Sequence, residues 1–231
     1  GVGGIDKGFE ETGFFKTIYA NEFDSYPVQT FEKNFDLKVD CRSIRDVKVE
    51  EIPDFQVMLA GFPCQSFSVA GLRQGFDDQK GRGTLFFELI RIIKEKKPEI
   101  VFLENVKNLV GHDNGNTFKV IIEELEKAGY KNPKFKVLNA MEYGNIPQNR
   151  ERVFTVSIRK DLGINYKFPK KQKLKIKLKD LLDENVDESF YLSDERIRKI
   201  AHWKSYQKPF EKVNGTESIV PTLTARGAGE E

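Results

Sequence analysis

A lone cysteine, Cys64, lies in the most reactive context of this sequence. It follows an apolar run at residues 55–60, which predicts a β-strand, and the Gly61-Phe62-Pro63 turn that ends this strand. Active-site nucleophiles favour strand-end turns, because ligands gather at the carboxyl ends of strands in an α/β sheet. A free thiol is also a common buried apolar group, so the turn alone leaves both interpretations open.

Carboxylates follow two other predicted strands. Glu104, with Asn105 beside it, ends the apolar run 100–103, and a carboxylate there is costly unless it has a partner or a role. Glu22 ends the run 15–20, roughly 20 residues after a glycine turn, where a carboxylate suits a ribose diol. An ordinary surface acid is the alternative for Glu22.

The glycine turn is Gly1-Val2-Gly3-Gly4, and it leads into a helix predicted to extend to about residue 11. Glycines at the start of a helix let backbone amides approach a ligand closely. Asp40, which follows a helix predicted over 26–34, is a candidate to accept hydrogen bonds from an adenine amino group, or is one loop aspartate among many.

Arg150 and Arg152 come directly before a strand predicted over 153–158. Residues at i and i+2 of a strand share one face, so the two guanidinium groups could address a common anion. A salt-bridged surface is the ordinary alternative for such a pair.

Strands and helices alternate from residue 1 to residue 159, which indicates an α/β fold with a doubly wound, mostly parallel sheet. Further helices are predicted over 84–96 and 118–128, a further strand over 135–138, and a capped helix over 193–203. The 231 residues suffice for one such core and a smaller appendage. No membrane span or signal peptide is present, and the 2 cysteines suggest a reducing, intracellular (cytoplasmic) compartment.

Lysines are concentrated in one segment, although the net charge is only +2. Residues 173–179 alternate lysine with an apolar residue, which predicts a strand with its lysines on one face. The pattern is typical of an edge strand protected by lysines and equally of a surface that contacts phosphates.

The string Gly-Phe-Pro-Cys-Gln-Ser-Phe-Ser at 61–68 resembles the nucleophile motif of the cytosine-C5 DNA methyltransferases. Glu104-Asn105-Val106 and Gln148-x-Arg150-x-Arg152 follow in that family's order, and the resemblance covers nearly all of residues 1–158. It implies a Rossmann-like, S-adenosylmethionine-dependent methyltransferase of bacterial or phage restriction–modification type. Segments 179–186 and 221–225 are similar to the target-recognition region, so we expect a catalytic domain at 1–160 and part of that region at 161–231.

The resemblance also implies a role for each site residue. Cys64 would attack carbon 6 of a flipped-out cytosine, Glu104 would act as a protonated carboxyl near N3, Asn105 would orient Glu104, and Arg150 and Arg152 would stabilise the thiolate and hold the base. No metal is implied. The implied cofactor site consists of Gly1, Gly3, Gly4, Glu22, Asp40, Cys41, Phe62, Pro63 and Leu85.

Duplex DNA is the expected partner. An RNA (tRNA) cytosine-C5 methyltransferase and a non-catalytic nucleic-acid-binding member of the family are the alternatives, and the intact Cys64, Glu104 and Arg152 argue against the second. The sequence departs from the family by an additional residue, Asn145, and by lacking the family's last two segments. We expect those segments from a downstream stretch or from a second chain.

Overall fold

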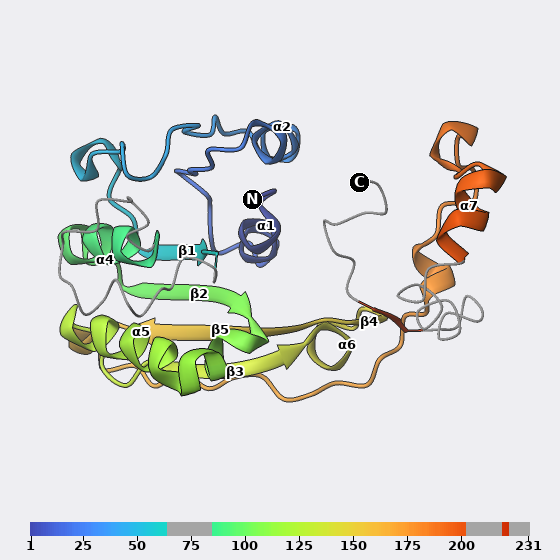
Figure 1. Ribbon diagram of the computed structural model, residues 1–231. Coiled ribbons are helices and arrows are strands. Elements are labelled where there is room, and N and C mark those ends of the chain that lie inside the picture. The colour runs from blue at the N-terminus through green and yellow to red at the C-terminus, as the bar shows by residue number, and fades with distance from the viewer. Residues whose placement is uncertain (64–84, 202–218, 222–231) are drawn as a thin grey trace. The chain divides into compact units, whose positions relative to one another are not determined.

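The computed structural model describes residues 1–63, 85–201 and 219–221 (Figure 1). It divides into two compact units. The first consists of Gly1–Lys136 and Val153–Lys167, and the second of Val137–Arg152 and Phe168–Glu231. No helix in the described ranges is long and apolar enough to cross a membrane.

A four-stranded sheet with the order β1-β2-β5-β3 forms the centre of the first unit. β1 and β2 are parallel, and their register places Gly61 opposite Glu104 at the carboxyl ends. β5 runs against its neighbours, as Figure 1 shows. The α/β fold class is therefore confirmed. The strands are β1 (Val57–Gly61), β2 (Ile100–Val106), β3 (Lys134–Asn139) and β5 (Glu151–Ile158).

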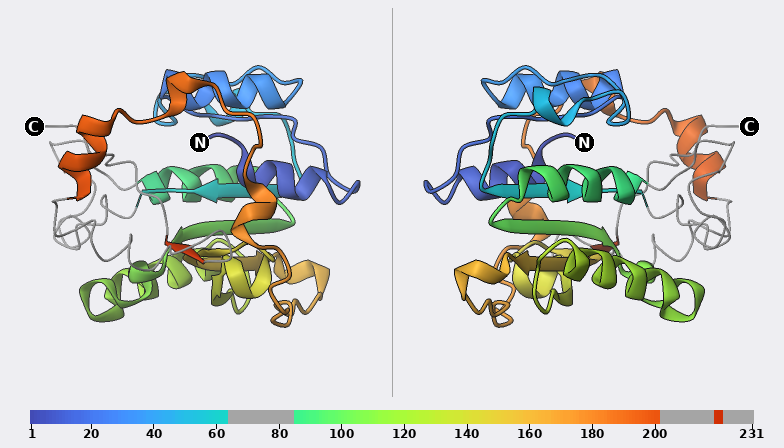
Figure 2. Two further views of the ribbon diagram at one scale, coloured as in Figure 1. Left: turned by 90° about the vertical axis from the view of Figure 1, so that its right-hand side faces the viewer. Right: turned by 90° about the vertical axis from the view of Figure 1, so that its left-hand side faces the viewer.

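The two faces of the sheet carry different helices, because successive side chains of a strand point to opposite faces. Phe102 of β2 meets Phe9 of α1 (Gly4–Glu10) edge to face, with ring centroids 5.3 Å apart. Its neighbour Leu103 lies on the other face, beside Phe118 and Ile121 of α5 (Asn116–Lys127). Figure 2 shows α1 on one side of the sheet and α4 and α5 on the other.

The core is formed where α4 (Leu85–Lys96) and α5 cover the sheet. Both helices have apolar residues at helical spacing, as the sequence predicted, and each fully buried apolar side chain contributes about 1.5–3 kcal/mol. The buried apolar residues of these elements are Met58, Phe86, Ile90, Ile92, Ile93, Val101, Leu103, Phe118, Ile121, Leu125, Val153 and Val156.

Shorter elements complete the first unit. The helix α2 spans Ser25–Asn34. Asp24 directly precedes it and caps it, because the Asp24 side chain accepts from the Tyr26 N–H. The remaining elements among the described residues of this unit are 3₁₀ segments, namely η1 (Val49–Glu51), η3 (Lys107–Gly115) and η4 (Lys160–Leu162).

The second unit contains a two-stranded ladder in which β4 (Gln148–Asn149) pairs in parallel with β6 (Val220–Pro221). Its α-helices in the described ranges are α6 (Ala140–Tyr143) and α7 (Asp194–Ala201). The predicted cap of α7 is confirmed, because Ser193 Oγ accepts from the Arg196 N–H at 3.3 Å. The 3₁₀ segments are η5 (Leu178–Leu181) and η6 (Glu188–Phe190).

Two predicted strands are wrong. In the described residues, 15–20 and 173–179 form no regular strand, since residues 178 and 179 belong to η5, and one isolated parallel bridge, Asn21 to Asp40, follows the first segment. Alternation and β-propensity indicate an extended chain, but a strand also needs a neighbouring backbone to complete its ladder.

Candidate active site

The glycine turn is constrained by both backbone and packing. Gly3 is buried and caps α1 with φ 83°, a left-handed conformation that favours glycine. A Cβ atom on Gly3 would lie 2.5 Å from the Phe35 ring and 2.8 Å from the Phe31 ring. Gly4 is exposed, and a Cβ atom there would meet nothing within 4 Å. Gly3 is thus needed for folding, whereas the space above Gly4 is open to a ligand.

Glu22 and Asp40 are held side by side by a short stretch of parallel backbone. The Asp40 N–H donates to the Ala20 carbonyl at 2.9 Å, and the Glu22 N–H donates to the Asp40 carbonyl at 3.1 Å. The Asn21 side-chain amide donates to the Asp40 carbonyl at 2.9 Å. The nitrogen of Gly1 contacts the Glu22 carboxylate. Three predicted parts of the cofactor site, namely Gly1, Glu22 and Asp40, are therefore brought together.

The Glu22 carboxylate is half-buried but ionised. Its partial burial disfavours the charge, but hydrogen bonds, among them one from the Asp24 N–H at 2.9 Å, outweigh this and lower the pKa of Glu22. An ionised carboxylate only accepts hydrogen bonds, which is the property that a sugar diol requires.

The Asp40 carboxylate lies in a network that the sequence did not predict. Arg42 donates from Nε to Oδ1 at 3.0 Å and from Nη2 to Oδ2 at 2.7 Å, and the Tyr19 hydroxyl donates to Oδ2 at 3.0 Å. The hydrogen bonds from Arg42 lower the pKa of Asp40 to about 2. Burial and the bond to Asp40 raise the pKa of Tyr19. An adenine amino group at Asp40 would compete with these donors.

Arg42 also binds Glu51, with Nη2 and Oε2 2.6 Å apart. The only sequence signal for its contact with Asp40 is the opposite charge two residues away. Nothing in the sequence indicated Tyr19, which lies in the segment wrongly predicted to be a strand.

Phe23 is a second residue that sequence reasoning missed. Its side chain is 71% exposed, and it directly follows Glu22. Cys41 is also exposed, with its Sγ 3.8 Å from the Phe23 carbonyl oxygen. An exposed aromatic face beside a carboxylate can stack on a planar base while the carboxylate binds the attached sugar. An aromatic residue directly after a strand-end carboxylate was the available signal.

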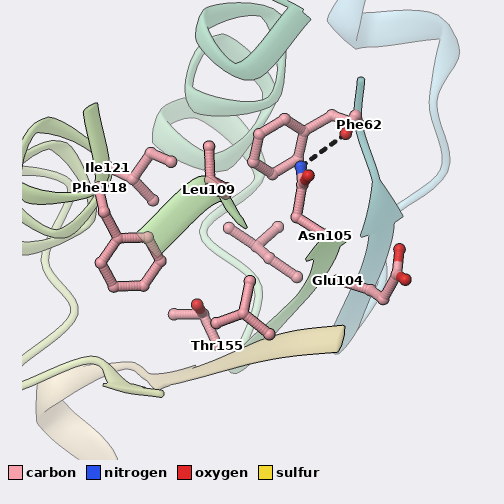
Figure 3. A pocket seen from close by; sticks show the side chains of 9 residues that line it. Phe62, Glu104, Asn105, Leu109, Phe118, Ile121 and Thr155 are labelled. Carbon is pink, nitrogen blue, oxygen red and sulfur yellow. Dashed lines mark hydrogen bonds between the residues drawn. The ribbon is translucent and has the colours of Figure 1, made fainter. Parts of the chain in front are cut away.

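Glu104 and Asn105 leave the end of β2 on opposite faces (Figure 3). A Cβ atom on Gly61 would lie only 3.2 Å from Glu104 Oε2, so the two strand ends approach closely where the Glu104 carboxyl lies. On the other face, the buried Asn105 donates from Nδ2 to the Phe62 carbonyl at 2.7 Å. Its Oδ1 accepts from the Val106 N–H at 2.8 Å. Asn105 therefore fixes the turn that precedes Cys64.

The turn itself is anchored in the core by Phe62, whose buried ring lies 5.6 Å from that of Phe86. Pro63 is exposed, and Leu85 is the half-buried first residue of α4. Cys64 and the residues that follow it, to 84, lie outside the described residues.

A small cavity lies behind Asn105 (Figure 3). Its volume of about 10 Å³ is at most that of one water molecule, so it is a packing defect of the core and not a site for a base. Its lining residues are Phe62, Leu103, Glu104, Asn105, Leu109, Phe118, Ile121, Val153 and Thr155.

Arg150 and Arg152 belong to the second unit, where Asn139 organises their segment. Asn139 Oδ1 accepts from the Arg150 N–H at 3.2 Å, and its Nδ2 donates to Asn149 Oδ1 at 2.7 Å. Arg152 donates from Nη1 to the carbonyl of Glu151 at 2.8 Å. The grouping of Cys64, Glu104 and the two arginines around one base stays a prediction.

The family model of the C-5 cytosine-specific DNA methylases matches residues 1–226. This chain belongs to that family. By class it is therefore a DNA (cytosine-5-)-methyltransferase, and the predicted family and enzyme class are confirmed.

Bacterial members of the family are close in sequence. The chain is 54% identical to the type II methyltransferase M.Bsp6I of Bacillus sp. (strain RFL6), over 97% of the chain and 75% of the relative. It is 38% identical to the type II methyltransferase M.HhaI of Haemophilus parahaemolyticus, over 99% of the chain and 73% of the relative. These relatives do not support the predicted second chain.

A solved structure agrees on the fold. The crystal structure of a DNMT2 mutant of Spodoptera frugiperda matches this methylase with a TM-score of 0.67 at 22% identity, over 87% of this chain and 63% of that chain. The chain thus spans less than two thirds of that protein. At this identity the likeness supports the fold and leaves the substrate to other arguments.

Proposed function

We propose that this protein transfers a methyl group from S-adenosylmethionine to carbon 5 of a flipped-out cytosine in a specific duplex DNA sequence. The observation that carries the proposal is the Asn105–Phe62 hydrogen bond, because it ties the Glu104 strand end to the turn before Cys64. Membership of the methylase family supports duplex DNA as the substrate.

The residues of the first unit fit the cofactor. The open space above Gly4 permits close approach to the backbone at the start of α1, and the ionised Glu22 suits the two ribose hydroxyls. The exposed ring of Phe23 offers a stacking face for adenine, and Asp40 and Cys41 lie beside it. When bound, this cofactor supplies a methyl group on a positively charged sulfur.

Cys64 would start the reaction as a thiolate, the form in which cysteine is nucleophilic. Its sulfur forms a bond to carbon 6 of cytosine, and the electron pair of the 5,6 double bond moves to carbon 5 and towards N3. Glu104 would donate a proton or a hydrogen bond at N3 as this charge develops. Once carbon 5 is methylated, its proton would pass to water, the returning electron pair would expel the Cys64 thiolate, and the proton at N3 would return to Glu104.

The other residues prepare these steps. Asn105 would hold the Cys64 turn in place through Phe62, and Arg150 and Arg152 would stabilise the thiolate and the carbonyl oxygen of the base. Because the target atom is buried in a stacked duplex, the cytosine must be extruded before the thiol can reach it.

The wider setting is also part of the proposal. Residues 1–160 would form the catalytic domain and residues 161–231 would begin the target-recognition region. The type II relatives favour a role in a restriction–modification system, inside the cell, where the thiol stays reduced.

The test is to express the protein in cells that lack cytosine methylation and to sequence both genomic DNA and tRNA for 5-methylcytosine. We expect methylation of DNA within one short recognition sequence, and none in cells that express the Cys64→Ala variant. Methylation of tRNA alone, or the same DNA signal from the variant, would contradict the proposal.

A further inference from the structure

Three lysines of the second unit form a regular charged row. Lys173, Lys175 and Lys177 are exposed, whereas the apolar residues between them, Leu174 and Ile176, are half-buried. The alternation that predicted a strand is therefore present, although no ladder holds it. We call Lys173, Lys175 and Lys177 the lysine track.

Asn145 fixes the track in place of a neighbouring strand. It adopts φ 52°, a left-handed conformation that asparagine tolerates better than most residues. Its Oδ1 accepts from the Lys175 N–H at 2.7 Å and from the Ile176 N–H at 3.4 Å. Asn145 thus anchors the track.

Two further contacts hold the segment just before the track. The Gln172 N–H donates to the Glu142 carbonyl at 2.8 Å, and the Gln172 side-chain amide donates to the Tyr143 carbonyl at 2.6 Å. Lys171 pairs with the Glu142 carboxylate at 2.7 Å. The charge of Lys171 is therefore used within the protein, and the three residues of the track are exposed.

The track ends at an acidic residue. The Asp180 carboxylate accepts from the Lys177 N–H at 2.8 Å, and η5 begins at the next residue, Leu178. In an extended chain, alternate residues are about 6.6 Å apart, so three lysines cover roughly 13 Å. That equals the rise of about four nucleotides along the duplex axis, on which each strand has one phosphate per ~3.4 Å.

We propose that the lysine track, held by Asn145, contacts the phosphates of one strand of duplex DNA. This inference deepens the proposed function and rests on it. Because phosphates have the same charge in every sequence, the track would add affinity and orientation but no base specificity. An extended row of ammonium groups suits a regular polyanion, since each lysine acts as a flexible point charge.

The test is the salt dependence of duplex binding, measured by fluorescence anisotropy on target and non-target DNA. Each neutralised phosphate contributes about 0.9 to the slope of log affinity against log salt concentration, so the triple variant Lys173→Gln/Lys175→Gln/Lys177→Gln should lower that slope by up to about 2.7. The loss should be equal for both duplexes. In methylation assays the KM for DNA should rise while kcat stays unchanged.

A matched control removes the same charge elsewhere. Lys33, Lys48 and Lys131 are exposed lysines of the first unit, and their triple change to glutamine also lowers the net charge by three. We expect this control to keep the wild-type slope. An equal loss of slope in the control would overturn the proposal, because general electrostatic attraction would then explain it.

The anchor is tested separately by Asn145→Gly, which tolerates the same backbone conformation but removes the acceptor. All charges remain, so the slope should change little while affinity at one salt concentration falls several-fold, because the freed segment must be ordered on binding. Unchanged affinity would contradict the role of Asn145.

The outcomes separate this proposal from the proposed function. If the wild type methylates duplex DNA and the track variant keeps its slope, the track assignment fails and the methyltransferase proposal stands. If the wild type does not bind duplex DNA, both fail. If only the binding of tRNA depends on the track, its assignment to duplex DNA is wrong.

Discussion

Asn105 donates from Nδ2 to the carbonyl oxygen of Phe62 at 2.7 Å, and this bond joins the end of β2 to the turn that leads to Cys64. Both residues are buried, so neither group can exchange its partner for bulk water. Because β2 is held in the sheet, this bond also holds the turn before Cys64 in a fixed position.

Loss of this bond should impair chemistry more than folding. Asn105→Ala leaves the buried Phe62 carbonyl without its donor, which should lower the free energy of unfolding by about 1–3 kcal/mol. The displaced turn should slow single-turnover methylation by about 10²-fold, since small misplacements of reacting groups have effects of that size. Urea denaturation and rapid-quench assays measure the two quantities.

The matched control for Asn105 is Asn34→Ala, which removes an exposed asparagine at the end of α2. It should leave the single-turnover rate unchanged. A normal rate in a folded Asn105→Ala enzyme would show that the turn does not depend on this bond.

The close approach of Gly61 to Glu104 gives a second prediction. In Gly61→Ala the new methyl group would lie 3.2 Å from Glu104 Oε2 and displace the carboxyl by a few tenths of an ångström. We expect the single-turnover rate to fall towards that of Glu104→Gln, in which loss of the acid should cost about 10²-fold or more. Gly111→Ala, where a Cβ atom meets nothing within 4 Å, is the control. Equal single-turnover rates for the Gly61 and Gly111 variants would contradict the predicted displacement of the Glu104 carboxyl.

Two residues of the glycine turn should have different roles: Gly3 is required by the packing of the turn, and Gly4 is expected to contact the cofactor. Gly3→Ala combines a left-handed backbone with contacts at 2.5 Å and 2.8 Å, so it should destabilise the fold. Gly4→Ala meets no protein atom within 4 Å and should fold normally, because alanine favours helix by about 1 kcal/mol. Calorimetry should nevertheless show weaker binding of S-adenosylmethionine by Gly4→Ala. Wild-type affinity would place the cofactor elsewhere.

How much of this site was predictable differs from residue to residue. Asn105 was selected because it ends a predicted strand that the structure contains, and Glu22 and Asp40 were selected from the order of the motifs. Tyr19 was missed because its contact with Asp40 depends on how two separate segments pack together. Arg42 was missed because opposite charges two residues apart do not by themselves predict a contact.

The fold, like the site, was predicted only in part. The helices α4 and α5 were predicted because their apolar residues recur at helical spacing, and packing against the sheet agrees with that pattern. The strands predicted at residues 15–20 and 173–179 are absent as regular strands, because pairing depends on a partner that the local sequence does not specify. For residues 173–177 that local pattern still placed the lysines correctly, since side chains alternate in any extended chain.

Asp40 should make stability depend on pH in the acid range. Its pKa is about 2 in the folded protein, below the ordinary value of 3.8, so the unfolded state binds a proton more readily. The stabilisation is thus complete above about pH 4 and is lost as the pH falls towards 2. In urea unfolding at a series of pH values, Asp40→Asn should show a shallower acid decline than Asp36→Asn, in which an exposed aspartate is changed. Parallel curves would contradict the network around Arg42.

The central claim is that Cys64 bonds covalently to cytosine. Duplex DNA in which 5-fluorocytosine replaces the target base should trap that adduct in the presence of S-adenosylmethionine, because the fluorine prevents the final loss of a proton from carbon 5. On a denaturing gel we expect a protein–DNA complex for the wild type and for Cys41→Ala, and none for Cys64→Ala. A complex of normal yield with Cys64→Ala would show that another group attacks the base and would contradict the account.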